Sequence, residues 1–127
     1  MKKAGIDVAL LAVGGSTGNI GSYDGIPVYP TIADPRGNDI VWDHARDFGA
    51  DVILTLGDPH VFLPEVYGTF PRWIAWAPLD FDRPTKATLR SLQAAHQIWS
   101  PSRYGVDAYQ TAGLQNVKWV PHGIDSS

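Results

Sequence analysis

Cysteine is absent from the 127-residue sequence, and its other scarce features exclude further classes of protein. Without cysteine the chain has no disulfide framework, no zinc–thiolate site and no cysteine nucleophile, which fits a cytoplasmic location. The longest apolar run, Val8–Val13, is far too short to cross a bilayer, so we expect no transmembrane segment. Ten lysine and arginine residues against 13 acidic residues give a net charge of −3. That balance argues against nucleic acid as a partner.

Apolar segments alternate along the sequence with segments of helical periodicity. Hydrophobic residues make up 44% of the chain, which is typical of one globular domain, here residues 1–127. Strand-like and helix-like segments follow one another at intervals of about 20–25 residues, as in a parallel sheet with covering helices. The sequence therefore predicts an α/β fold, a three-layer Rossmann-like domain with a mostly parallel sheet. Strands are expected at Ile6–Val13, Ile26–Pro30, Asp51–Leu56, Arg72–Ala77, Gln97–Trp99 and Val117–Val120, and helices at Asp39–Phe48, His60–Tyr67, Thr85–Ala95 and from Ser102 through Ala112.

Polar residues follow several of the predicted strands. In open α/β sheets, ligands bind beyond the carboxyl ends of the strands. This rule points to five segments: Gly14–Asp24, Asp58–His60, Pro78–Asp82, Ser100–Tyr104 and His122–Asp125. Because the chain has no cysteine and only four scattered histidines, we expect no metal centre.

Residues Gly14–Gly18 match Gly-x-Ser-x-Gly after a predicted strand, which is the nucleophile-elbow pattern of α/β-hydrolases. Ser16, Asp80 and His122 also follow the chain order of that fold's catalytic triad. The elbow requires a helix directly after the serine, and residues 19–27 contain no helical pattern. We therefore interpret the segment as a flexible loop, and a hydrolase is a distant alternative.

An ordered set of motifs spans most of the chain. ADVILTLGD (Ala50–Asp58) is followed by WAPLD (Trp76–Asp80), and then by IWSPSRYGVDAYQTAGLQNVKWVPHGID (Ile98–Asp125). KKAGIDVALLAV and DGIPVY precede them. In this order the motifs resemble the N-terminal domain of group 1 glycosyltransferases, which have the GT-B fold. The resemblance implies transfer of a sugar from a nucleotide-sugar substrate to an acceptor hydroxyl, with no tightly bound cofactor.

The resemblance implies that Asp58 and His60 are the catalytic residues. Either side chain would take the acceptor's proton or contact the acceptor, which is a carbohydrate or another hydroxyl compound. The alternative for Asp58 is structural, because an aspartate directly before a helix often caps it. The acceptor cleft would also be lined by Asp80, Ser102 and Tyr104. The hinge to a donor-binding domain would contain His122, Gly123 and Asp125.

Asp80-Phe81-Asp82 is also similar to the Asp-x-Asp metal site of glycosyltransferases with the GT-A fold. Pro78 and Pro84 flank this tripeptide, so a solvated acidic turn is the simpler interpretation. We therefore assign no metal to it.

Two parts of the family pattern have no counterpart in this sequence: the first strand with its glycine-rich loop, and the donor-binding domain. The resemblance therefore implies one part of an enzyme that is inactive alone. The absent strand would lie between Ile6–Val13 and Asp51–Leu56, so we expect these strands to leave exposed edges and the chain to form a homo-oligomer through them. The alternative is a non-catalytic, stand-alone α/β module that binds a partner or oligomerises.

Overall fold

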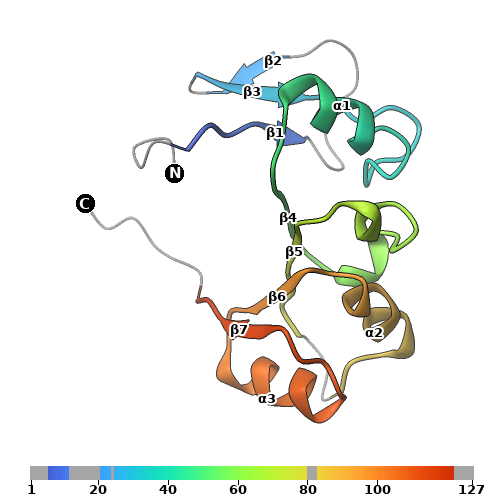
Figure 1. The fold of residues 1–127 in the computed structure, drawn as a ribbon, viewed down its shortest axis with the longest axis vertical. Helices are drawn as coiled ribbons and strands as arrows, with labels where there is room; N and C mark the ends of the chain where they lie inside the picture. The colour runs from blue at the N-terminus through green and yellow to red at the C-terminus, as the bar shows by residue number, and fades with distance from the viewer. Residues whose placement is uncertain (1–5, 12–20, 24, 80–82, 122–127) are drawn as a thin grey trace. The chain divides into compact units, whose positions relative to one another are not determined.

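The computed structural model describes residues 6–11, 21–23, 25–79 and 83–121, and the chain divides into two compact units (Figure 1). Unit 1 comprises Met1–Ala50, and unit 2 comprises Asp51–Ser127. Each unit combines a sheet with helices, and all but one of the pairings between described strands are parallel. The predicted α/β fold with mostly parallel strands is therefore confirmed. That the two units form a single domain stays a prediction.

The sheet of unit 1 contains three short strands in the order β1-β3-β2. Strand β1 (Leu10–Leu11) runs parallel to β3 (Ile26–Tyr29), and β2 (Gly21–Tyr23) runs antiparallel to β3. The buried strand expected at Ile6–Val13 is wrong in its described part, because residues 6–9 are not in a strand and Leu10 is exposed. The reason is that β1 forms only two residue pairs, both with β3.

The prolines in the segment Ile26–Pro30 predict a strand near an edge of its sheet. That prediction is wrong, because β3 is the central strand of its sheet. Pro27 is tolerated because it pairs only with Ser22 of β2, while the pairing with β1 begins at the next residue, Val28. The missing N–H of Pro27 therefore lies outside the ladder with β1. Strand β2 was not predicted, because Gly-Ser-Tyr is too short and polar to show a strand pattern.

Helix α1 (Val41–Phe48) packs against the end of β3. The Tyr29 hydroxyl donates a hydrogen bond to Asp47 Oδ2 at 2.7 Å, and the Tyr29 ring lies 4.7 Å from the ring of His44. The hydrogen bond to Asp47, with burial and the negative charge of that carboxylate, raises the pKa of Tyr29 above its ordinary value. The helix ends as predicted at Gly49, whose φ of +76° is a left-handed conformation that favours glycine.

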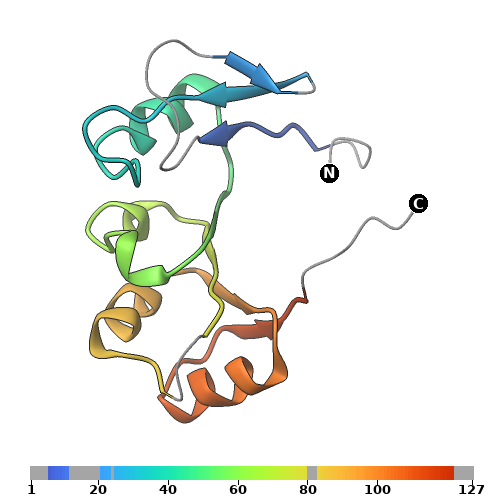
Figure 2. The ribbon, with the colours of Figure 1, turned by 180° about the vertical axis from the view of Figure 1, so that it is seen from behind.

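The sheet of unit 2 contains four parallel strands in the order β4-β5-β6-β7. Their bounds are Ile53–Leu56, Trp73–Trp76, Gln97–Ser100 and Val117–Trp119, within the segments predicted as strands except that β6 extends one residue further. Parallel strands in sequential order, joined by right-handed crossovers, have all their connections on one face. The helices of unit 2 accordingly lie on one side of its sheet in both views (Figures 1 and 2).

Two predicted helices are present in unit 2. The position of Ser102 directly before the second of them predicts that it caps that helix, and the structure shows a side-chain cap on both helices. In α2 (Lys86–Gln93), the Thr85 hydroxyl accepts a hydrogen bond from the Thr88 N–H. In α3 (Arg103–Thr111), the Ser102 hydroxyl accepts one from the Gly105 N–H at 3.0 Å. No helix in the described part of the chain has the length and hydropathy needed to cross a membrane.

The helix predicted at His60–Tyr67 is wrong. Two short 3-10 helices are present instead, η2 (Pro59–Val61) and η3 (Tyr67–Thr69). Pro64 falls in the middle of the predicted helix, where it has no N–H to donate and its ring obstructs the preceding turn.

The core of unit 2 lies between the sheet and these helices. Trp73 is completely buried, its Nε1 donates to Thr55 Oγ1 at 3.1 Å, and its ring lies 5.7 Å from the ring of Tyr67. Because Trp119 falls in a predicted strand, the sequence predicts that it too belongs to the core, and this is wrong because its side chain is exposed. Trp119 lies on the last strand of the sheet, where its ring instead packs under the Arg103 guanidinium at 4.3 Å.

Candidate functional site

A pocket of about 320 Å³ lies beyond the carboxyl ends of β4 and β5 in unit 2. This is the place where parallel α/β sheets bind ligands, and the volume is within the range of about 300–1,000 Å³ that is typical of small-molecule sites. The residues that line it are Asp58, Pro59, His60, Pro78, Leu79, Thr85, Ala87, Thr88 and Tyr109. The pocket therefore brings together both residues that the sequence placed at the centre of the chemistry.

Asp58 follows β4 after a single glycine and immediately precedes η2. Its backbone carbonyl accepts a hydrogen bond from the Val61 N–H at 3.3 Å, but its side chain makes no capping hydrogen bond. The capping role that was the alternative for Asp58 is therefore not observed. The exposed carboxylate instead lines the pocket, where it is placed to accept hydrogen bonds from a ligand.

His60 is exposed within η2, and the residues around it are anchored in the core. Pro59 is buried, and the buried ring of Phe62 makes an edge contact with Tyr67 at 5.1 Å. These contacts fix the backbone on both sides of the imidazole. A fixed backbone limits the positions that the His60 ring reaches, which is what a binding or proton-transfer group requires.

The first turn of α2 contributes the opposite wall of the pocket. Thr85 Oγ1 accepts from the Thr88 N–H and also lies 3.1 Å from Thr88 Oγ1, so the two hydroxyls form one connected pair. Thr88 is buried, and Ala87 beside it lines the same wall. The sequence predicted this helix but neither its cap nor a role in a site for these residues, because the rule that was applied considers only the ends of strands.

Tyr109 reaches the pocket from α3 and is completely buried. Its hydroxyl donates to the carbonyl oxygen of Ala77 at 2.9 Å, across 32 residues of sequence. This bond holds the end of β5 directly before Pro78 and Leu79, which line the pocket. No sequence signal distinguished Tyr109 from other tyrosines, so its position follows only from the packing of α3.

The lining combines a few polar groups with apolar walls. The carboxylate of Asp58 accepts hydrogen bonds, the imidazole of His60 donates and accepts them, and the threonine hydroxyls do both. Three of the remaining residues, Pro59, Pro78 and Leu79, provide apolar surface. Such a mixture suits a small polyhydroxy compound, whose hydroxyl groups pair with the polar side chains while its C–H groups contact the apolar walls.

Two of the other predicted site residues, Ser102 and Tyr104, are described by the structure and do not line this pocket. Ser102 uses its hydroxyl to cap α3, and Tyr104 is exposed at the start of that helix. Neither lines the pocket at Asp58. The remaining predicted residues lie outside the described part of the chain: Ser16, Asp80, His122, Gly123 and Asp125.

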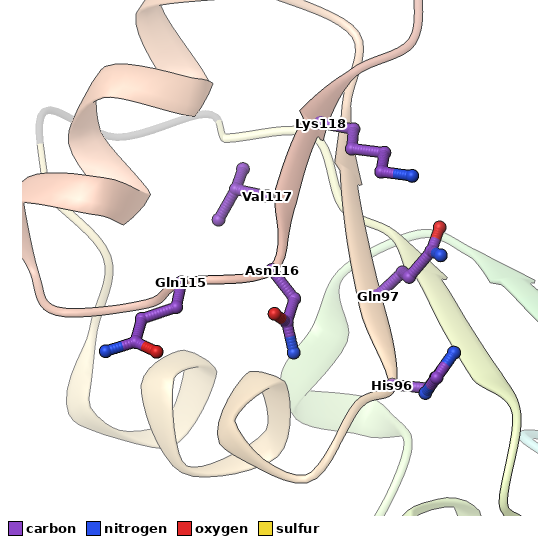
Figure 3. Close-up of a pocket in the computed structure, with 6 residues that line it drawn as sticks. All are labelled: His96, Gln97, Gln115, Asn116, Val117 and Lys118. Atoms are coloured by element: carbon purple, nitrogen blue, oxygen red, sulfur yellow. The ribbon is translucent and has the colours of Figure 1, made fainter.

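A second hollow of about 330 Å³ lies at the opposite, amino-terminal end of β6 and β7 (Figure 3). Its lining is His96, Gln97, Gln115, Asn116, Val117 and Lys118. Figure 3 shows Gln97 and Lys118 on one side of their strands and Val117 on the other, so the hollow wraps around the strand ends. Because ligands of parallel sheets bind at the carboxyl ends, the pocket at Asp58 is the stronger candidate.

Within the described residues, no group of three or more histidine, cysteine, aspartate or glutamate side chains is arranged to hold a metal ion.

Comparison of the chain with protein family models, with curated proteins and with solved structures gave no match.

Proposed function

We propose that this chain is the acceptor-binding part of a glycosyltransferase, with the pocket at Asp58 as its acceptor site. The observation that carries the proposal is that Asp58 and His60, two positions apart in the chain, both line a pocket at the carboxyl ends of parallel strands. The resemblance of Ala50–Asp58 and Ile98–Asp125 to group 1 glycosyltransferases supports the same assignment. Under this proposal the donor is a nucleotide-sugar, which enters as a substrate.

The proposed chemistry requires one proton transfer at this site. Asp58 or His60 takes the proton of the acceptor hydroxyl while the hydroxyl oxygen forms a bond to the anomeric carbon of the sugar. The bond between that carbon and the phosphate oxygen breaks, and the nucleotide leaves with its electron pair. A correctly placed base of this kind accelerates a reaction by about 10²–10⁴-fold. Because the proposal assigns to this chain the acceptor site and its base but not the binding of the donor, we expect no measurable transfer by the 127-residue protein alone.

Acceptor binding can be tested by NMR titration of the ¹⁵N-labelled chain with a panel of methyl hexopyranosides. We expect at least one glycoside to shift the amide signals of Gly57, His60 and Thr88. Asp58→Asn and His60→Ala should each reduce that response, since each removes a group that hydrogen-bonds to the sugar. Asp107→Asn is the matched control, because Asp107 is exposed on α3 and does not line the pocket.

Three results of this experiment would contradict the proposal, and each has a different meaning. Shifts confined to the amides of Gln97, Asn116 and Lys118 would move the sugar site to the opposite end of the sheet and refute the role of Asp58. The absence of shifts with every glycoside would refute acceptor binding by this chain. An unchanged response in both Asp58→Asn and His60→Ala would show that neither side chain contacts the sugar.

A second candidate function is a non-catalytic module that acts by assembling with other chains. The observation in its favour is the position of β4 at the edge of the described sheet, with apolar side chains exposed. An oligomer that forms through β4 but shows no response to the glycosides would favour this module over the acceptor-binding protein.

A further inference from the structure

Strand β4 lies at the edge of the described sheet of unit 2, and no described strand pairs with its outer side, which we call the open edge. Among the described strands only β5 pairs with it, and that pairing uses one side of β4. The N–H groups of Ile53 and Gly57 donate to β5 at the carbonyls of Arg72 and Trp76. Because the backbone groups of a strand alternate in direction, those of Leu54 and Leu56 face the open edge.

The side chains next to this edge are apolar and exposed. Val52, Leu54 and Leu56 alternate along the strand and so lie on one face of the sheet, the face opposite the buried Thr55. Their exposed fractions are 45%, 39% and 56%. We call these three residues the edge row. Natural sheets protect such edges with lysine, proline or a bulge, and residues 51–57 contain no lysine or proline.

The edge row is self-complementary in one antiparallel register. Residues whose backbone N–H and C=O groups face the open edge of one copy must pair with residues of the same kind in the other copy. In β4 these are the even-numbered residues, so even-numbered residues pair with even-numbered residues. When Leu54 lies opposite its own copy, Val52 lies opposite Leu56 at both ends, and every member of the edge row has an apolar partner on the same face. In this register Asp51 lies opposite Gly57 of the other copy, so no two acidic residues lie directly opposite one another.

We propose that two copies of this chain form a dimer by antiparallel pairing of β4 with β4, with the two-fold axis at Leu54. The partner is a second copy because this register gives every member of the edge row an apolar partner and places no two acidic residues directly opposite one another. The pairing joins the two four-stranded sheets into one and gives the backbone groups of Leu54 and Leu56 hydrogen-bond partners. This dimer does not depend on the proposed enzymatic function.

The absence of cysteine allows a direct test of the register, since each engineered thiol is the only one in its chain. Directly paired residues in an antiparallel ladder have Cα atoms about 5.5 Å apart, a distance that a disulfide can span. Leu54→Cys should therefore form a covalent dimer under mild oxidation. Leu63→Cys is the matched control, because Leu63 is similarly exposed at 41% but lies outside the strand. It should form little covalent dimer, because its two thiols do not face each other across the strand pair.

A mixed experiment makes the register specific. Val52→Cys and Leu56→Cys should each form little covalent dimer alone, because each thiol lies opposite a residue without one. When the two variants are mixed, a disulfide-linked heterodimer should form. Efficient cross-linking of Val52→Cys to itself would refute the register, and equal cross-linking of Leu54→Cys and Leu63→Cys would refute the interface.

Sedimentation velocity of the unmodified chain tests the dimer without a cross-link. The chain should sediment as a dimer at high concentration, and Leu54→Lys should shift it to monomer, because two ammonium groups would lie opposite each other at the axis. Leu63→Lys should leave the dimer intact, and circular dichroism of both variants checks that each has folded. A chain that is monomeric at every concentration, or a dimer that survives Leu54→Lys, would overturn the proposal.

Discussion

Gly105 is the position where a single methyl group should have the largest effect on the first turn of α3. A Cβ atom built at this residue would lie 2.2 Å from Ser100 Oγ and 3.1 Å from Ser102 Oγ. Ser100 is completely buried, its hydroxyl donates to the carbonyl of Ser102 at 2.8 Å, and it accepts from the Ser102 N–H at 3.3 Å. The serine hydroxyl therefore has no free space into which it can rotate when Gly105 is replaced by alanine.

The expected change in the free energy of unfolding combines two destabilising contributions and one stabilising contribution. Forcing an extra methyl group into a packed site costs about 1–3 kcal/mol. Loss of the hydrogen bonds of Ser100 adds about 0.5–1.5 kcal/mol. Alanine is favoured over glycine in a helix by about 1 kcal/mol, which offsets part of the cost. We therefore expect Gly105→Ala to lower the free energy of unfolding by about 1–3 kcal/mol.

Urea unfolding followed by circular dichroism and tryptophan fluorescence measures this difference. Gln110→Ala is a control at an exposed position of the same helix, and it should change the free energy of unfolding by less than about 0.5 kcal/mol. Ser100→Ala removes the atom that the methyl group strikes, so the double variant should be more stable than the sum of the two single effects predicts. Additive effects, or a Gly105→Ala protein as stable as the wild type, would refute the steric argument.

Three further substitutions test individual contacts by the same unfolding measurement. Thr85→Ala removes the N-cap of α2 and should cost about 1 kcal/mol, and Thr85→Ser should restore most of it. Tyr109→Phe leaves the buried carbonyl of Ala77 without its partner and should cost about 1–3 kcal/mol. Tyr29→Phe removes the hydrogen bond to Asp47 and should cost about 1 kcal/mol. Because the pKa of Tyr29 is raised above its ordinary value of 10.0, the advantage of the wild type over Tyr29→Phe should be complete below pH 10 and decline as the pH rises further. A constant difference across that range, or Thr85→Ser as unstable as Thr85→Ala, would contradict the respective argument.

Local signals in the sequence predicted the helices of unit 2 well. Ser102 stands directly before a segment of helical periodicity, which predicts that it caps that helix, and its side chain does so in the structure. The helix predicted at Thr85–Ala95 is also present, although its cap at Thr85 was not predicted. Such signals succeed because a cap and its helix are neighbours in the chain. The predicted helix at His60–Tyr67 failed for a local reason as well, since Pro64 lies inside the segment and its effect outweighs the apolar spacing.

The pairing of strands and the burial of their side chains were less predictable, because both depend on which segments pack together in the folded chain. The apolar composition of β4 suggested a buried strand, yet Leu54 and Leu56 are exposed, since β4 is the edge of the described sheet. The proline residues near β3 suggested an edge, yet β3 is central because β2 pairs with it. A hydrophobic pattern shows that a segment is a strand, but it does not identify the strands on either side.

In the candidate site, too, the residues that follow a strand in the sequence could be predicted, and those brought in by tertiary packing could not. Asp58 and His60 could be predicted from sequence, because they directly follow a strand and the ends of parallel strands are where ligands bind. Thr88 and Tyr109 could not be predicted, because they come from helices that reach the pocket only through tertiary packing. Ser102 was predicted for two roles, a helix cap and a cleft residue, and its hydroxyl is engaged as a cap.

The proposed pocket and the proposed dimer share β4, yet they should act independently. Antiparallel pairing about Leu54 places Asp58 of one copy opposite Ala50 of the other, so the two pockets lie at opposite ends of the strand pair. The two Asp58 residues would be eight positions apart along the strands, or about 27 Å at 3.4 Å per residue. Leu54→Lys should therefore abolish the dimer without changing the response of His60 to a glycoside, and Asp58→Asn should do the reverse. If dissociation of the dimer also removed glycoside binding, the second copy would have to contribute to the pocket, and the antiparallel register would be wrong.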